Sequence, residues 1–167
     1  DLLQVVRLCE SAIEKGLDEE NTAFAKQLLV SSLWQRAQQY SAAIFDQPRP
    51  TPQWREFRAT ISTDLEKLLK YDEKFAEAHV LTAKLQALPG GDRKEARKSA
   101  STAIKLYREK EDTKEVAKTL LLRAQLRNDK EERMADINAA IKTDPESFEA
   151  LQMRAAVHLS DGEPDKA

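Results

Sequence analysis

Residue types that commonly carry out chemistry are few in this sequence of 167 residues. It contains two histidines, His79 and His158, and one cysteine, Cys9, and no histidine pairs with the cysteine at the spacing of a metal site. Cys9 lies on an apolar stripe at helical spacing, which favours a buried packing residue over a reactive thiol. No nucleophile elbow, P-loop or dinucleotide-binding glycine motif occurs. The sequence therefore predicts no catalytic residue, no metal and no cofactor, and hence a protein that is not an enzyme.

The charged residues point the same way. Adjacent acids such as Glu19-Glu20 and Glu131-Glu132 lie on different sides of a helix and cannot share a proton between them. The net charge is only −2, so no large basic field attracts nucleic acid or an anionic membrane. We therefore expect neither as a partner. The single cysteine leaves the cellular compartment open.

One stretch, residues 93–118, is rich in basic residues. Nine Lys and Arg alternate there with five acids, and Asp92 directly before the stretch is a sixth, which favours a solvated helix face with pairs three or four residues apart. A basic patch that meets an acidic partner remains the alternative.

The elements that must position any site are helices, because apolar residues recur every three to four positions almost throughout. We expect Gly16 to end the first helix, Asn21 to cap a second that runs to Ile44, and Thr51 with Pro52 to begin a third. Asp72 is expected to cap a fourth helix that Pro89-Gly90-Gly91 ends. The Pro-rich residues 46–53 read as an insertion loop.

Four later helix starts carry clearer signals. Asp92, Asp112 and Asp129 each stand three residues before a glutamate, as in a capping box, and Asp144 precedes a proline. They predict helices near 92–109, 113–127, 130–143 and 146–160. The chain is thus all-α, with about eight helices.

An internal repeat is visible in the small residues. Arg-Ala recurs at Arg36-Ala37, Arg123-Ala124 and Arg154-Ala155, and Ala-Ile recurs at Ala103 and Ala140. Small residues at such places let two helices approach closely. With Asp144-Pro145, Leu151, Ala155 and Gly162 at matching positions, the chain resembles the tetratricopeptide repeat (TPR) family, a 34-residue helix–turn–helix repeat.

The resemblance implies an α-solenoid, a right-handed superhelix of antiparallel helix–turn–helix repeats, as a single domain over residues 1–167. It also places His79 and His158 at packing positions. Ala167 falls on a small position of a second helix, so we expect a fragment of a longer protein that is cut within a repeat, with an apolar end through which it self-associates.

The resemblance further implies a concave groove lined by the first helix of each pair. Its inward residues are Trp34, Gln38, Lys84, Lys118, Leu121, Gln125, Gln152 and Ala156. We therefore predict a non-enzymatic protein–protein interaction module or scaffold that binds a partner peptide or helix, in trans or from another domain of the same chain. The alternative is a regulatory or oligomerisation segment of a larger multidomain protein that is itself an enzyme.

Overall fold

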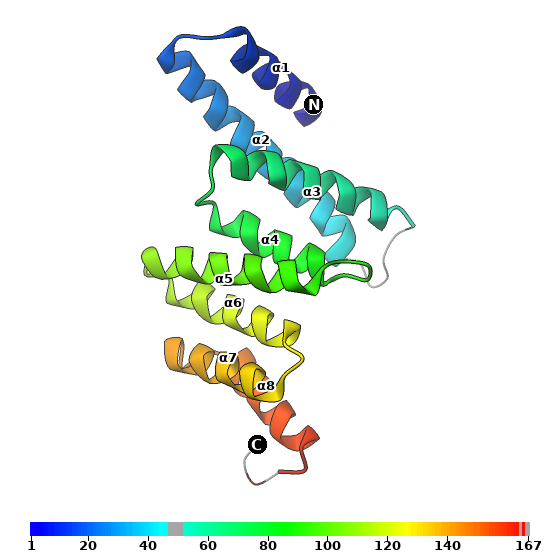
Figure 1. Cartoon of the computed structure of the whole chain (residues 1–167), viewed down its shortest axis with the longest axis vertical. Coiled ribbons are helices and arrows are strands. Elements are labelled where there is room, and N and C mark those ends of the chain that lie inside the picture. Colours follow the sequence, from blue (N-terminus) through cyan, green and yellow to red (C-terminus); the bar gives the residue numbers. More distant parts are fainter. Residues whose placement is uncertain (47–51, 164, 166–167) are drawn as a thin grey trace. The chain divides into compact units, whose positions relative to one another are not determined.

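The computed structural model describes residues 1–46, 52–163 and 165, and these form eight α-helices and no strand. The predicted all-α class is confirmed for this part of the chain. The helices are α1 (Leu2–Lys15), α2 (Glu19–Phe45), α3 (Trp54–Tyr71), α4 (Ala76–Ala87), α5 (Arg93–Glu109), α6 (Thr113–Leu126), α7 (Lys130–Thr143) and α8 (Phe148–Ser160) (Figure 1).

The chain divides into two compact units, residues 1–78 and 79–167, and the boundary falls in the first turn of α4. The predicted right-handed superhelix of one domain depends on how these units are placed, and it stays a prediction. No described helix is both long enough and apolar enough to cross a bilayer.

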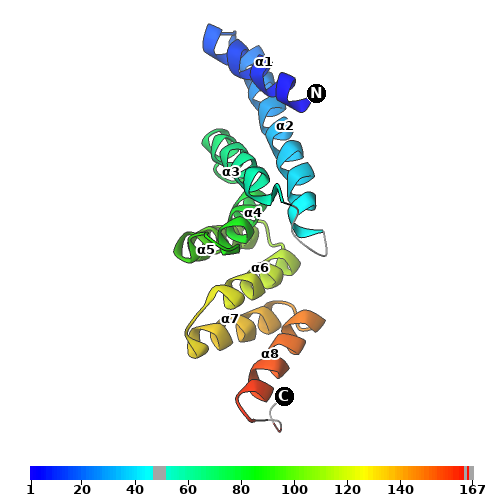
Figure 2. The same ribbon diagram turned by 90° about the vertical axis from the view of Figure 1, so that its right-hand side faces the viewer.

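In unit 1, α2 is the central helix and packs against α1 and α3 (Figure 1 and Figure 2). Its core combines one apolar stripe from each helix, as their spacing predicts. The buried side chains include Val6, Cys9, Leu29, Leu33, Ile61, Leu65 and Leu68. The C-terminal half of α2 carries two aromatic contacts. Trp34 packs against Phe75 at a centroid distance of 5.1 Å, and Tyr40 stacks on Phe57, also at 5.1 Å.

In unit 2, each of α5, α6 and α7 packs against the next helix along the chain (Figure 1 and Figure 2). The small residues of the internal repeat lie in these contacts: Ala103, Ala124 and Ala140 are fully buried, as Ala37 is in unit 1. Since an alanine lets two helix axes approach closely, the repeat pattern identifies these four packing positions correctly, whereas Ala155 of the third Arg-Ala pair is only half-buried on α8.

Three predicted helix starts are confirmed. The carboxylates of Asp92, Asp112 and Asp129 each accept a hydrogen bond from the backbone N–H three residues on. The reciprocal half of a capping box fails for two of them, because the backbone N–H of Asp92 donates to Gln86 Oε1 and that of Asp112 to the Tyr107 carbonyl. Gly16, at φ 81°, ends α1 as predicted, and the turn that contains Gly90 follows the end of α4.

Two predicted caps before the middle of the chain are wrong. Asp18, not Asn21, caps α2: its carboxylate accepts the Asn21 backbone N–H at 2.8 Å and the Asn21 side-chain amide at 2.7 Å. Pro52 lies in a turn and not at the first helical position, because the first helical hydrogen bond of α3 runs from Phe57 to the Gln53 carbonyl. Thr51 and the core of the Pro-rich loop, residues 47–51, lie outside the described residues.

Two further caps are wrong in the same way. Asp72 and Asp144 end α3 and α7 instead of beginning the next helices, and their backbone N–H groups donate to Leu68 and Ala140. Their φ and ψ angles agree closely, −140° and 86° against −136° and 90°. Ser147 takes the cap of α8. The same turn therefore recurs once in each unit.

Candidate partner-binding surface

The residues with catalytic potential are used in packing. Cys9 is buried, and this burial raises the pKa of its thiol. His79 and His158 are half-buried, and His158 Nδ1 lies 3.1 Å from Glu163 Oε2. Among residues 1–46, 52–163 and 165, no group of three metal-ligating side chains comes together. Cys9 is thus a buried packing residue, as its helical spacing predicts.

The predicted groove residues divide between the units. Trp34 and Gln38 belong to unit 1, where the Trp34 ring packs against Phe75 and Gln38 is exposed. Lys84, on α4, is exposed in unit 2. Whether the two sets share a surface depends on the placement of the units, so one groove along the whole chain stays a prediction.

The other five groove residues lie on α6 and α8 of unit 2, and Ala156 is exposed on α8. Lys118 and Gln125 are exposed on α6, whereas Leu121 between them is only 6 % exposed and belongs to the core. Lys118 donates to Glu115 Oε1 at 2.6 Å. This bond raises the pKa of the Lys118 ammonium, and the charge of Glu149 on α8 adds a smaller contribution. Gln152 is exposed on α8.

A pocket of about 380 Å³ opens where α6, α7 and α8 meet. Its walls combine apolar groups from α8 with three polar side chains. The lining residues are Gln125, Arg133, Met153, Ala156, Val157 and Ser160. Its volume falls within the usual range of ligand pockets, and the mixture of apolar walls with a few polar groups is typical of them. Gln125, and Ala156 beside it, are the predicted groove residues that the structure brings together here.

Arg133 is the residue of this pocket that the sequence did not reveal. Its Nη2 donates to the Arg127 carbonyl at 3.0 Å, while its Nε is buried without a hydrogen-bond partner. Among the described residues no carboxylate pairs with it. The pocket therefore contains a guanidinium that is held in place and is not neutralised locally.

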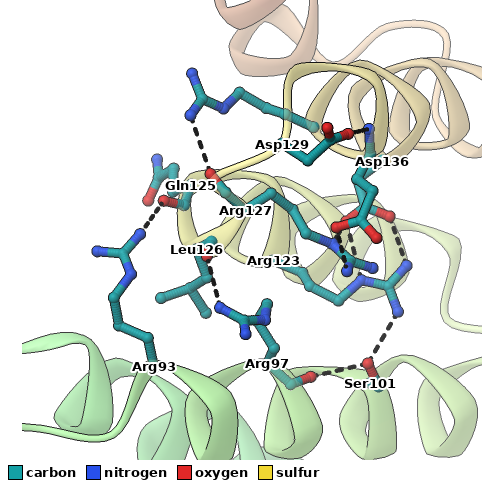
Figure 3. Close-up of polar contacts among 11 residues, drawn as sticks. Arg93, Arg97, Ser101, Arg123, Gln125, Leu126, Arg127, Asp129 and Asp136 are labelled. Carbon is teal, nitrogen blue, oxygen red and sulfur yellow. Dashed lines mark hydrogen bonds and ion pairs between the residues drawn. The ribbon is translucent and has the colours of Figure 1, made fainter.

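Arginines also hold the C-terminal end of α6. Arg93 and Arg97, on α5, donate to the carbonyls of Gln125 and Leu126 at 3.1 and 3.2 Å (Figure 3). With the bond from Arg133 to Arg127, three successive carbonyls near this helix end each accept from a guanidinium. A helix C-terminus carries partial negative charge and unpaired carbonyls, so cations stabilise it. This fixes the wall that carries Gln125.

Close to this end, Asp136 on α7 joins two arginines of unit 2 (Figure 3). Arg123 donates to it from Nε at 3.0 Å and from Nη2 at 2.5 Å, and Arg127 donates from Nε at 3.3 Å. A fourth bond, from Arg123 Nη1 to Ser101 Oγ at 2.9 Å, reaches α5. The cluster therefore ties α5, α6 and α7 together around a buried carboxylate.

Unit 1 contains a similar ion pair between an arginine and a buried aspartate. Arg36 on α2 donates from Nε to Asp64 Oδ2 at 2.7 Å and from Nη2 to Oδ1, and this contact raises the pKa of Arg36. In both units the arginine precedes a fully buried alanine, and the aspartate stands eight residues before the aspartate that ends its helix. The Arg-Ala repeat was the sequence signal for these pairs, but it did not reveal the aspartates.

A second pocket, of about 780 Å³, lies in unit 1 among α1, α2 and α3. Its lining includes Leu2, Arg36, Tyr40 and Thr60. Arg36 is already paired with Asp64, and the Tyr40 ring stacks on Phe57. The guanidinium of Arg36 in this pocket is therefore already neutralised by a carboxylate, whereas that of Arg133 is not.

Comparisons with protein-family models, with curated proteins and with solved structures find no match. The resemblance to tetratricopeptide repeats therefore stays a prediction that rests on the residues of this chain. The geometry itself defines the strongest candidate site, which is the surface of unit 2 between α6 and α8 with its pocket at Gln125 and Arg133.

Proposed function

We propose that this chain is a non-enzymatic protein–protein interaction module of TPR type, which binds a segment of a partner protein between α6 and α8. The observation that carries the proposal is the pocket at the meeting point of α6, α7 and α8. It offers apolar walls for a side chain together with an amide, a guanidinium and a hydroxyl. Such a combination recognises peptides, because the apolar walls supply affinity and the polar groups fix orientation.

Two of the three polar groups are held before any partner binds. The Arg133 guanidinium donates to the Arg127 carbonyl, and the Ser160 hydroxyl donates to the Val157 carbonyl at 2.8 Å. Ordering of flexible side chains opposes binding by about 0.5–1.5 kcal/mol for each one, so anchored groups favour affinity. The partner segment inserts one apolar side chain between Met153 and Val157, and its backbone or a polar group bonds to Gln125 and Arg133.

The experiment is a peptide selection on the full chain, followed by binding measurements with two α8 variants. Met153→Lys places a charge in the pocket. Leu151→Lys is the matched control, because Leu151 is 39 % exposed on the same helix and does not line the pocket. Circular dichroism verifies that both variants stay helical.

We expect Met153→Lys to weaken the selected peptides about tenfold or more, as for a central interface residue, and Leu151→Lys to leave their affinity nearly unchanged. An equal loss of peptide affinity in both variants would contradict binding in this pocket. So would selected peptides whose affinity neither variant changes. A selection that yields no peptide at all would also count against the proposal.

The alternative, an oligomerisation or regulatory segment of a larger protein, is favoured by one feature of α8. Phe148, Leu151 and Leu159 are 70, 39 and 59 % exposed, and their spacing of three and eight residues places them along one side of the helix. If a second copy covers this side, sedimentation shows a dimer that Phe148→Ser with Leu159→Ser dissociates. A monomer at every concentration removes this alternative.

A further inference from the structure

Helix α5 presents a row of cations that the proposed binding surface does not use. Lys94, Lys98, Lys105 and Arg108 are all exposed, and their spacings of four, seven and three residues place them on one face of the helix. Exposed Ser101 lies within the row, and no acidic residue does. The row therefore combines several positive charges along a single line.

The neighbouring arginines of α5 do not belong to this row. Arg93 and Arg97 turn to α6 and donate to its terminal carbonyls (Figure 3). The row itself is only loosely paired. Lys98 lies 3.5 Å from Glu95 and Lys105 lies 4.0 Å from Glu109, with lysine side chains that are 76 and 78 % exposed. Exposed pairs at such distances contribute little and exchange readily with other partners.

The row has a defined length. Lys94 and Arg108 are fourteen residues apart, which is about 21 Å along a helix. Acidic residues stand beyond both ends, with Asp92 before Lys94 and Glu109, Glu111 and Asp112 after Arg108, whereas Glu95 lies beside the row and pairs with Lys98. The positive surface is thus short and is bounded by negative charge.

We propose that this face of α5 binds a short acidic segment of a partner protein. The cations supply charge complementarity, and a segment with carboxylates over about 21 Å lies within the row. A nucleic acid or an anionic bilayer extends past both ends and meets the acidic residues there. In addition, Tyr107, the one tyrosine of α5, is buried, and α5 contains no tryptophan, so this helix offers no such ring to stack on bases. The face lies on a different helix from the α6–α8 pocket, so the two proposals stand or fall separately.

The experiment measures binding of a fluorescent peptide of alternating Glu and Ser to the full chain, with an alternating Gln and Ser peptide as the uncharged control. Single-stranded DNA and vesicles that contain phosphatidylserine are measured in parallel. Lys98→Glu with Lys105→Glu reverses the centre of the row. Lys114→Glu with Lys142→Glu is the matched control, because it changes the net charge equally at exposed lysines of α6 and α7.

We expect the acidic peptide to bind at about 20 mM salt, to dissociate as salt screens the charges, and to bind more tightly than DNA or vesicles. The α5 double variant should lower its affinity about tenfold or more, and the control variant by less than about threefold. Equal losses in the two variants would reduce the effect to overall charge and overturn the proposal. So would tighter binding of DNA or vesicles, or no binding of the acidic peptide.

Discussion

Replacing Asp64 by alanine tests the role of the buried ion pairs. Asp64 is fully buried, and Arg36, which donates two hydrogen bonds to it, is 13 % exposed. The variant leaves a guanidinium in the interior of unit 1 with no carboxylate. Breaking a buried pair in this way typically costs about 3–5 kcal/mol. Because whole domains are stable by only about 5–15 kcal/mol, we expect Asp64→Ala to remove a large share of the stability of unit 1.

The assay is urea unfolding followed by tryptophan fluorescence. Both tryptophans, Trp34 and Trp54, lie in unit 1, so fluorescence reports on this unit alone. The control is Glu66→Ala, two residues away on the exposed side of α3, which should change the free energy of unfolding by less than about 0.5 kcal/mol. The midpoint of Asp64→Ala should fall well below that of the parent and of the control.

A double variant separates the charge from the packing. Arg36→Met together with Asp64→Leu removes both ions and keeps apolar volume, so it should be much more stable than Asp64→Ala alone. If Asp64→Ala lowers the free energy of unfolding by less than about 1 kcal/mol, the reasoning is refuted, because a buried guanidinium without a partner destabilises a protein by more than that. A double variant as unstable as the single one would show that the cost does not arise from the charge.

Three further predictions concern other residues. Arg97→Gln should destabilise unit 2 by about 1–2 kcal/mol in urea unfolding, because it removes a charged bond to the end of α6, whereas Lys98→Gln should be nearly neutral. The Cys9 thiol should react with a disulfide reagent roughly a hundredfold more slowly than in the unfolded chain. Because burial raises the pKa of this thiol, its reaction rate should increase only at a higher pH than the rate of an exposed thiol does. Fast labelling of Cys9 at neutral pH would contradict this prediction. Gly16→Ala should cost about 1 kcal/mol from its φ of 81° alone, since a Cβ there meets no atom within 4 Å, and an unchanged melting temperature would exclude this strain.

Helix class and approximate number were predictable because periodic apolar spacing and polar caps are local signals. Where the prediction failed, two local signals competed. Asp18 and Asn21 are both good caps, and the carboxylate of Asp18 takes the bonds, including one from Asn21 itself. Asp72 and Asp144 look like helix starts, yet their backbone N–H groups complete the preceding helices.

The ion pairs of the two units could be predicted only in part. Ile61, Asp64, Leu65 and Leu68 follow one stripe at helical spacing, so the charge on this stripe was visible in the sequence. Its partner was not, because Arg36 is 28 residues away across a proline-rich connection. Identifying the pair requires the packing of α2 against α3.

By itself, the sequence determined that this protein is helical and that small residues recur at regular positions along its helices. Only the tertiary structure decided which charged side chains are free. Arg93 and Lys94 are adjacent in the sequence, yet the first caps α6 and the second faces solvent. The pocket likewise exists only where α6, α7 and α8 meet, because residues from Gln125 to Ser160 must converge to line it. Such contacts depend on how helices pack, and local spacing carries no information about that.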